Sequence, residues 1–291
     1  MNTGVRFTGS SMHVTLALAQ RVERTEIEFC ATLAGLERDH GGRSLEAGGG
    51  RALYAAPDSP LNKMLGLGLG ADVTASDLDA IERFYGAVAC PIQIELCPYV
   101  SPDLLAKLSE RGYVLRAFEN ELGAPMDRLR PLIEAPAASE PSVEIVTAAD
   151  GDQWLDVVVQ GFAVTDGGRD APPTTDEARA AIRRAMKQFS RPSVWRYLAR
   201  IDGEPAGGCG SYVHDGILGI FGTATIPRFR RRGVQQAVVA RAVRDGLNLA
   251  DMAVATTEPG STSQRTFERA GFQVLYTRAI LVKPHPRSTV R

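Results

Sequence analysis

The sequence has almost no net charge, few cysteines and no long apolar run, and each of these absences excludes a class of protein. Lys and Arg total 33 against 34 Asp and Glu, which leaves no protein-wide positive field for nucleic acid or an anionic membrane. The cysteines form no C-x-x-C pair and no histidine cluster accompanies them, which argues against a zinc site or a disulfide framework. They are Cys30, Cys90, Cys97 and Cys209.

Membrane and export signals are also missing. No apolar run approaches the ~20 residues of a membrane span. The N-terminus lacks a charged region followed by an unbroken apolar one, and residues 1–12 are small and polar, as in an unstructured lead-in. We therefore expect a soluble, cytoplasmic protein without metal, membrane or nucleic-acid partners, present as a monomer or a homodimer.

Length and composition leave room for two domains. The chain has 291 residues, of which 44% are hydrophobic, so a sizeable core can form. The stretch RPLIEAPAASEPS is rich in Pro, Ala and Ser, as interdomain linkers are. The sequence therefore predicts a first domain over 1–130, a linker over 131–142 and a second domain over 143–291.

Helical and strand patterns alternate in both halves. In the first half, helices are predicted over 13–39, from Thr74 onward and in SPDLLAKLSERG, with a glycine-rich break at HGGRSLEAGGGR. Strands are predicted at 52–56, LNKMLGLGLGAD, PIQIELCPYV and YVLRAFENELG. In the second half, helices are predicted over 151–162, 175–189, 234–250 and 261–270. The strands there are predicted at 143–147, 194–201, 205–214, 217–225, 252–257 and 272–282.

The two halves also resemble each other. LGLGLGAD matches LGIFGTAT, and LSERGYVLRAFENEL matches FERAGFQVLYTRAIL. Self-similarity of this kind predicts two copies of one α/β unit. The glycines of GLGLG do not have the spacing G-x-G-x-x-G of a dinucleotide-binding site. A core strand that contains several glycines is therefore favoured over such a site.

Positive charge is concentrated in one stretch, IPRFRRRGVQQAVVARAV, where arginines and Gly233 precede a helical pattern. A helix start leaves backbone N–H groups without partners, and its dipole favours an anion. A glycine at the entry lets a phosphate approach the backbone, and arginines add bidentate contacts. The order of residues favours a pyrophosphate cradle over a solvated helix start or a nucleic-acid patch.

Arg230 to Gln235 resemble the acyl-CoA signature R-x-x-G-x-[GA] of the GNAT acyltransferase superfamily. STSQRTFERAGFQVLYTR is similar to the second conserved block of that family. The resemblance covers about half the chain. It implies a GNAT-like fold with a mixed, mostly antiparallel sheet flanked by helices, in two tandem copies of which the first is degenerate. It also implies acetyl-CoA as cosubstrate and direct attack by the amine of a small molecule or peptide.

The resemblance further implies which residues bind the cofactor. Backbone amides near Gly233 would hold the pyrophosphate, and the strand edge before the signature would pair with the pantetheine arm. The acidic start VTASDLDAIE of the first copy would repel a pyrophosphate, so that copy is not expected to bind CoA. The implied contacts are Thr223, Ala224, Thr225, Ile226, Arg230, Arg231, Arg232, Gly233, Val234, Gln235, Ser263 and Phe267.

Two positions depart from the family pattern. Gln235 replaces Gly or Ala, and Phe267 stands where the family usually has a tyrosine acid. The strand ILGIFGTAT also lacks the glutamate that often serves as general base. Glu258 is the first candidate for that base, although it could equally cap the following helix. His214 and Asp215 at the preceding turn are further candidates.

Simpler interpretations compete with the catalytic one. Because Phe267 cannot donate a proton, a non-catalytic acyl-CoA-binding or sensing protein is the main alternative. Cys209 is expected to be a packed strand residue, since no base is visible near it. Trp154, Trp195 and Phe162 are expected in the core. The polar loop VTDGGRDAPPTT is either a lid or a surface excursion.

Overall fold

The computed structural model describes residues 13–134, 141–146, 150–163, 175–189 and 194–285. The expected lead-in over 1–12 and nearly all of the loop VTDGGRDAPPTT lie outside the described residues. The described strands are β1 (Arg43–Ala47), β2 (Gly50–Tyr54), β3 (Met64–Leu65), β4 (Ile92–Leu96), β5 (Val114–Pro125), β6 (Ser142–Ile145), β7 (Trp195–Ile201), β8 (Glu204–His214), β9 (Ile217–Thr225), β10 (Met252–Thr257) and β11 (Gln273–Lys283). The helices are α1 (Leu16–Gly35), α2 (Ala75–Gly86), α3 (Pro102–Glu110), α4 (Arg130–Glu134), α5 (Gly151–Phe162), α6 (Asp176–Lys187), α7 (Val234–Gly246) and α8 (Thr262–Arg269).

All described strands join one sheet in the order β1-β2-β3-β4-β11-β5-β10-β9-β8-β7-β6. Only β3–β4 and β9–β10 pair in parallel, and the other neighbours are antiparallel. The units β3-α2-β4-α3-β5 and β9-α7-β10-α8-β11 have the same order of elements. The expected mixed, mostly antiparallel sheet with flanking helices is thereby confirmed.

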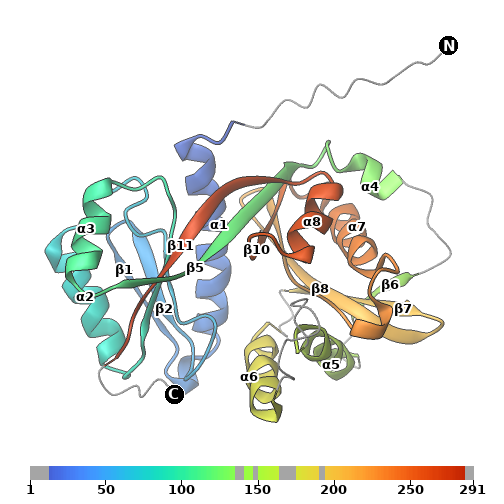
Figure 1. The fold of residues 1–291 in the computed structure, drawn as a ribbon, viewed down its shortest axis with the longest axis horizontal. Coiled ribbons are helices and arrows are strands. Elements are labelled where there is room, and N and C mark those ends of the chain that lie inside the picture. The colour runs from blue at the N-terminus through green and yellow to red at the C-terminus, as the bar shows by residue number, and fades with distance from the viewer. Residues whose placement is uncertain (1–12, 135–140, 147–149, 164–174, 190–193, 286–291) are drawn as a thin grey trace.

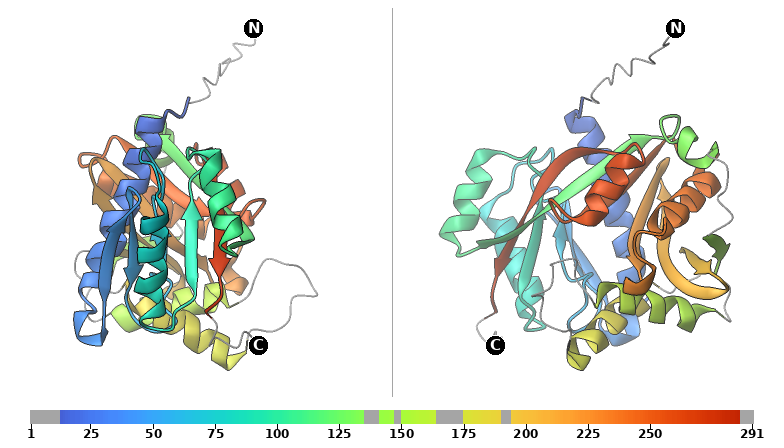
Figure 2. Two further views of the ribbon diagram at one scale, coloured as in Figure 1. Left: turned by 90° about the vertical axis from the view of Figure 1, so that its left-hand side faces the viewer. Right: turned by 45° about the vertical axis from the view of Figure 1, so that its right-hand side comes forward.

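The two halves exchange their last strands. β5 lies between β11 and β10, and β11 lies between β4 and β5, so each half inserts a strand beside the other half. Figure 1 shows β5 and β11 as a long ribbon that crosses from one half to the other, and the turned views of Figure 2 show the same ribbon. The long helix α1 contacts β1 and β2 of its own half and β8 and β9 of the other.

Local sequence signals explain the helix starts. The Thr74 side chain accepts from the Asp77 amide while the Asp77 carboxylate accepts from the Thr74 amide, which is a capping box. Ser101 and Ser261 cap α3 and α8 by accepting from Asp103 and Gln264 amides. The apolar faces of α5 and α7 pack on β7, β8 and β9 in the largest core cluster.

Two predictions in the first half are wrong. The glycine-rich break contains strand β1, which pairs with β2 through a turn at Gly48 and Gly49. The predicted strand LNKMLGLGLGAD is extended only over β3, because Gly66, Gly68 and Gly70 have φ between 70° and 81° and turn the chain. Leu67 and Leu69 are nevertheless buried, as a core segment requires.

The predicted linker over 131–142 includes most of α4 and the first residue of β6, and its middle lies outside the described residues. A domain boundary near residue 130 would divide the chain into two segments but would not divide the sheet, because β11 of the second half pairs with β4 and β5 of the first half. The boundary therefore stays a prediction about the order of the units along the chain.

Candidate functional site

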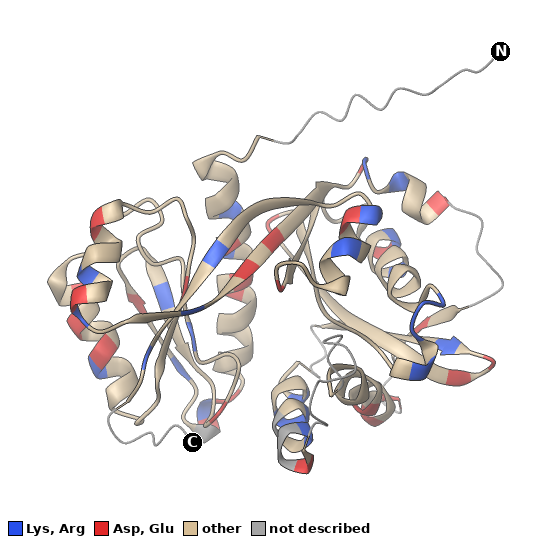
Figure 3. Ribbon diagram, in the orientation of Figure 1, with Lys and Arg blue, Asp and Glu red and all other residues tan. Residues whose placement is uncertain are grey.

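A cavity of about 700 Å³ lies where β9 ends and α7 begins. The last residues of β9, Thr223, Ala224 and Thr225, form one wall, and the turn into α7 forms another. Helix α8 faces this turn and contributes Ser263, among other residues. Figure 3 marks basic positions both at the turn before α7 and on α8. The cavity thus joins an open strand edge to a positively charged helix start.

The turn before α7 is built to expose backbone amides. Arg231 has φ 62° and Gly233 has φ 77°, so two left-handed residues stand within three positions of each other. Alternating backbone of this kind forms a concave nest of N–H groups. A Cβ placed on Gly233 would meet nothing within 4 Å, so its glycine serves the backbone conformation rather than close packing. Gly233 is also the N-cap of α7, whose first amides have no partners within the helix.

The strands β9 and β10 part beside this cavity. Their parallel pairing runs only from Met252 and Ile217 to Ala255 and Ile220, although both strands continue. In the same stretch the β8–β9 register shifts between Gly208 and Gly210, so Gly222 and Thr223 lie opposite one residue. A β-bulge of this kind leaves backbone groups out of the ladder. A gap lined with free backbone amides can accept an extended ligand and its carbonyl oxygen.

Comparisons with known proteins agree with this geometry. Residues 129–254 match a family described as an acetyltransferase (GNAT) domain. The chain contains a GNAT domain. A GCN5-related N-acetyltransferase from Kribbella flavida has 20% identity and a TM-score of 0.62, with 90% of this chain and 97% of that chain covered. No curated protein matches the sequence.

Two further structures resemble most of the chain. A GCN5-related N-acetyltransferase from Sphaerobacter thermophilus has 16% identity and a TM-score of 0.53, with 93% and 94% of the two chains covered. A tandem GNAT protein from the clavulanic acid biosynthesis pathway has 12% identity and a TM-score of 0.52, covering 81% of this chain and 74% of that one. These likenesses establish that the GNAT fold extends beyond the matched domain, and a GNAT domain supports acyl transfer in general.

The structure brings together ten of the fourteen predicted site residues. All ten line the cavity at the end of β9: Thr223, Ala224, Thr225, Arg230, Arg231, Gly233, Val234, Gln235, Ser263 and Glu258. The Arg230 guanidinium also donates to the Gly161 carbonyl of α5 at 3.3 Å. Glu258 is exposed, just beyond the end of β10, and its carbonyl accepts from the Ser261 amide.

Three predicted cofactor contacts lie elsewhere. Ile226 is only 6% exposed and packs in the core, and its amide donates to the Ala206 carbonyl. Arg232 points away from the cavity and pairs with Asp202 at 3.6 Å. Phe267 is 2% exposed and packs edge-on against Phe272, because it occupies the inward face of the amphipathic helix α8.

His214 is far from the cavity as well. It lies at the end of β8 beside the start of β9, whereas the cavity is at the other end of β9. Ile217 and Thr225 are eight positions apart, which is roughly 26 Å at ~3.3 Å per strand residue. The same turn holds Asp215, whose carbonyl accepts from the Arg21 guanidinium at 2.7 Å. Neither residue can act as a base at this cavity.

The core assignments are mostly confirmed. Trp154 and Cys209 are fully buried, and Trp195 packs against the same core. Burial raises the pKa of the Cys209 thiol well above its usual range, so it is not a nucleophile. Phe162 is the exception, since it is 42% exposed and lines the cavity.

Gln235, the departure from the family pattern, has a clear position. Its side-chain amide donates to the Ser263 hydroxyl at 2.9 Å and so links α7 to α8. The glutamine therefore spans the two helices that face each other across the cavity. Sequence reasoning could not find this link, because the two residues are separated by 27 others.

Several cavity residues have no sequence signal of their own. Gly161 lies where α5 approaches β9, and a Cβ there would come within 2.7 Å of the Ala224 Cβ. Arg269 of α8 adds a cationic side chain to those of Arg230 and Arg231. Gln236, Ser261, Thr262, Thr266 and Ala270 complete the lining. The helical spacing of the last four would have indicated one face of α8.

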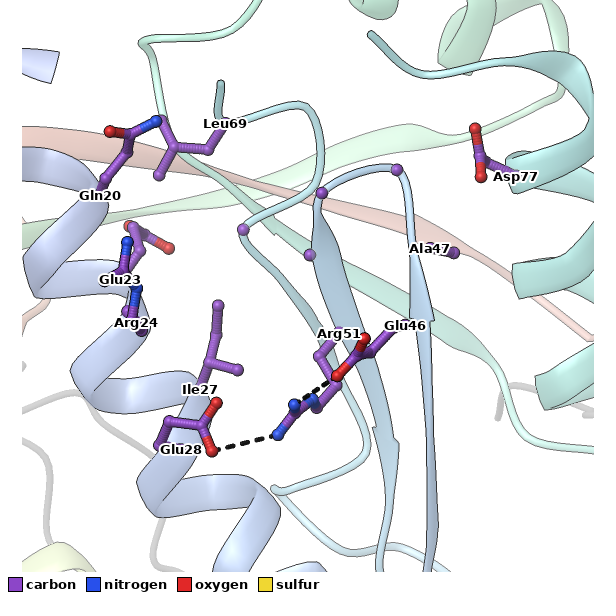
Figure 4. Close-up of a pocket in the computed structure, with 14 residues that line it drawn as sticks. Gln20, Glu23, Arg24, Ile27, Glu28, Glu46, Ala47, Arg51, Leu69 and Asp77 are labelled. Atoms are coloured by element: carbon purple, nitrogen blue, oxygen red, sulfur yellow. Dashed lines mark hydrogen bonds and ion pairs between the residues drawn. The ribbon is translucent and has the colours of Figure 1, made fainter. Parts of the chain in front are cut away.

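The first half has a hollow of its own, of about 530 Å³, shown in Figure 4. It lies between α1, the β1–β2 turn and the start of α2, and Arg51 there pairs with Glu28 and Glu46. Asp77 stands in the first turn of α2, where α7 of the other half has no acidic residue. No helix of the described residues is long and apolar enough to cross a membrane.

Proposed function

We propose that this protein transfers the acetyl group of acetyl-CoA to a primary amine. The observation that carries the proposal is the cavity in which the Arg231–Gly233 turn, the start of α7 and the gap between β9 and β10 meet. A turn of exposed amides with flanking arginines suits a pyrophosphate, and an unpaired strand edge suits the amide-bearing pantetheine arm.

Each part of the cavity has a chemical task in this proposal. The α7 amides and the guanidinium groups of Arg230 and Arg231 bind the pyrophosphate. The β9 edge at Thr223 to Thr225 pairs with pantetheine, so the thioester lies in the gap. Backbone amides freed by the bulge at Gly222 and Thr223 stabilise the oxyanion that forms when the amine attacks. The thiolate, with a pKa near ~8.5, leaves without an acid, which removes the need for a tyrosine at Phe267.

The first half is proposed to bind no CoA. Its hollow carries Glu28, Glu46 and Asp77, and carboxylates at a helix start oppose a bound phosphate. We propose that this half completes the acceptor side of the site and stabilises the sheet through β5. The alternative of a non-catalytic acyl-CoA sensor predicts tight acetyl-CoA binding without turnover on any amine.

Calorimetric titration with acetyl-CoA tests whether Arg230, Arg231 and the α7 amides bind the pyrophosphate. Arg231→Ala removes a charge-assisted contact of about 1.5–3 kcal/mol, so the dissociation constant should rise roughly 10- to 150-fold. Arg228→Ala is the matched control, because Arg228 belongs to the same segment but pairs with Glu204 at 2.9 Å outside the cavity. Equal affinity in both variants and the parent would refute the cradle.

A further inference from the structure

A second cavity, of about 210 Å³, lies between the two halves of the molecule. Helix α1 covers it, and strands β5, β8, β9 and β10 contribute to its lining. It reaches Gly222 on β9 and Thr256 on β10, whereas the larger cavity begins at Thr223 and includes Glu258. The two cavities are therefore lined by successive residues of the two strands that part.

Aromatic side chains form the wall of this second cavity. Phe29 of α1 stacks on Tyr212 of β8 with ring centroids 3.7 Å apart, and Phe221 of β9 lies 5.3 Å from Phe29. Phe189 adds a fourth ring, 4.9 Å from Phe221. Aromatic faces bind both apolar groups and cations, and a volume below the ~300 Å³ of ordinary ligand pockets limits the occupant to a compact molecule.

A carboxylate from the exchanged strand β5 also faces this cavity. Glu121 stands opposite Thr256 of β10, and its Oε2 accepts from the Thr256 hydroxyl at 3.0 Å. Its side chain is only 3% exposed, and the Thr256 hydroxyl bonds to Oε2 rather than to Oε1. A ligand N–H at this position could donate a charge-assisted hydrogen bond to Oε1.

The surrounding charges leave room for a cation. Arg278 pairs with Glu23, Glu26, Glu95 and Glu121, and Lys63 pairs with Glu26 and Glu95. Figure 3 shows acidic positions on β5 beside a basic one on β11. With Glu119, which lines the same cavity, five carboxylates face two cations. Where these carboxyl groups are ionised, one ammonium group would reduce this imbalance, whereas an additional carboxylate would increase it.

We propose that this inter-half cavity receives the acyl acceptor, a compact primary amine with an apolar body and no carboxylate, and that Glu121 accepts its ammonium proton. The inference rests on the proposed acetyl transfer. The aromatic wall holds the apolar body, and the carboxylates hold the ammonium group at the gap between β9 and β10. The first half thus supplies the base through its exchanged strand.

The proposed acetyl transfer moves two protons from the ammonium group. Glu121 Oε1 takes one proton from the ammonium group, and the freed nitrogen lone pair forms a bond to the thioester carbon. The carbonyl π electrons move to oxygen and return as the carbon–sulfur bond breaks. The departing thiolate takes a second proton from the nitrogen, which yields the acetamide and CoA thiol. Glu121 then releases its proton to water.

Glu121 is better placed for this step than Glu258. Glu121 lies on the strand next to β10, so about 4.8 Å of sheet spacing separates its backbone from that strand. Glu258 lines the larger cavity at an exposed position beyond the end of β10. If Glu121 is the base, the amine binds in the cavity between the two halves; if Glu258 is the base, it binds in the larger cavity.

The protonation behaviour of Glu121 agrees with this task. Burial raises the pKa of Glu121 to about 8, against the opposing effect of Arg278. Charged and titratable groups that face it from the neighbouring elements are Glu23 and Glu26 of α1, Arg278 and Tyr276 of β11, Lys63, Glu95 of β4 and Glu119 of β5. A base with a pKa near the working pH combines availability with proton affinity.

The first experiment compares two acceptors with acetyl-CoA-saturated protein, after calorimetry has shown that acetyl-CoA binds. Phenethylamine and phenylalanine share one body and differ by a carboxylate. CoA-thiol release should favour phenethylamine by at least 100-fold in kcat/KM, with cadaverine as a second carboxylate-free amine. Acetyl-CoA binding with no release from either amine, or with phenylalanine preferred, overturns the acceptor class. Failure of acetyl-CoA to bind would instead overturn the proposed function.

The second experiment compares Glu121→Gln with Glu258→Gln. Glu121→Gln should lower kcat by about 100-fold or more, leave acetyl-CoA affinity within twofold, and remove the rise of kcat/KM through about pH 8. Formate should restore part of the activity of Glu121→Ala, which a merely structural role would not allow. Phe221→Trp narrows the cavity without touching the carboxylates, and should raise KM for the amine alone. An unchanged kcat in Glu121→Gln, or the larger loss in Glu258→Gln, overturns the assignment.

Discussion

Replacement of Arg278 by methionine perturbs the contact between the two halves at its centre. The Arg278 side chain is fully buried, and its guanidinium lies 2.7 Å from Glu23, 2.6 Å from Glu26, 3.5 Å from Glu95 and 3.7 Å from Glu121. Methionine fills a similar volume but leaves four carboxylates with Lys63 as their remaining cation. Breaking a buried ion pair by removing one partner costs about 3–5 kcal/mol.

The expected loss should be measured as thermal and urea unfolding at pH 5 and pH 8. At ~2 °C per kcal/mol for a chain of this size, the melting temperature should fall by roughly 6–10 °C at pH 8. The loss should be smaller at pH 5, because the carboxylates take up protons more easily there.

Arg232→Met is the matched control for this prediction. It removes the Asp202 pair, in which both side chains are largely exposed, and such pairs contribute at most ~1 kcal/mol. A loss in Arg278→Met that is no larger than in the control, or that is the same at both pH values, would refute the account of the cluster.

The remaining predictions concern pH, the α5–β9 contact and the buried thiol. Burial raises the pKa of Glu121 to about 8 and of Glu119 to about 7, so the folded state keeps protons that the unfolded chain loses near pH 4.5. The free energy of unfolding should therefore fall by ~2 kcal/mol or more between pH 5 and pH 8. The fall should be smaller in Glu121→Gln. Gly161→Val places a Cβ 2.7 Å from that of Ala224, so calorimetry should show weakened acetyl-CoA binding and calorimetric scans a lower melting temperature. Cys209→Ala should keep acetyl transfer within about threefold, since the thiol is buried in the core, donates to the Val238 carbonyl at 3.7 Å and does not line the cavity. A loss of activity with an intact fold would contradict its packing role.

Much of the second half could be predicted from sequence, because its signals are local. Periodicity located β8, β9 and α8, and the arginine–glycine order located the turn that precedes α7. Glycine-rich stretches were harder. The alternating leucines of LGLGLG suggested a strand, but positive φ at its glycines makes it a set of turns, and β1 has too few apolar residues to stand out.

Long-range pairing is what the sequence could not supply. The exchange of β5 and β11 depends on contacts between residues more than about 120 positions apart, such as Arg278 opposite Glu119. The sequence therefore does not predict the carboxylate cluster or the cavity at Glu121, and it suggests His214 for the site although His214 lies at the other end of β9. Strand order, rather than any motif, determines which acidic residues meet the gap.

The account depends most directly on amine-dependent release of CoA thiol from acetyl-CoA, measured for the wild-type protein over a panel of primary amines. We predict saturable release with a compact, carboxylate-free amine, together with acetyl-CoA affinity that depends on Arg231 and Gly233. Tight acetyl-CoA binding without release on any amine would contradict acetyl transfer and support a sensor, and absence of binding would contradict the cofactor site itself.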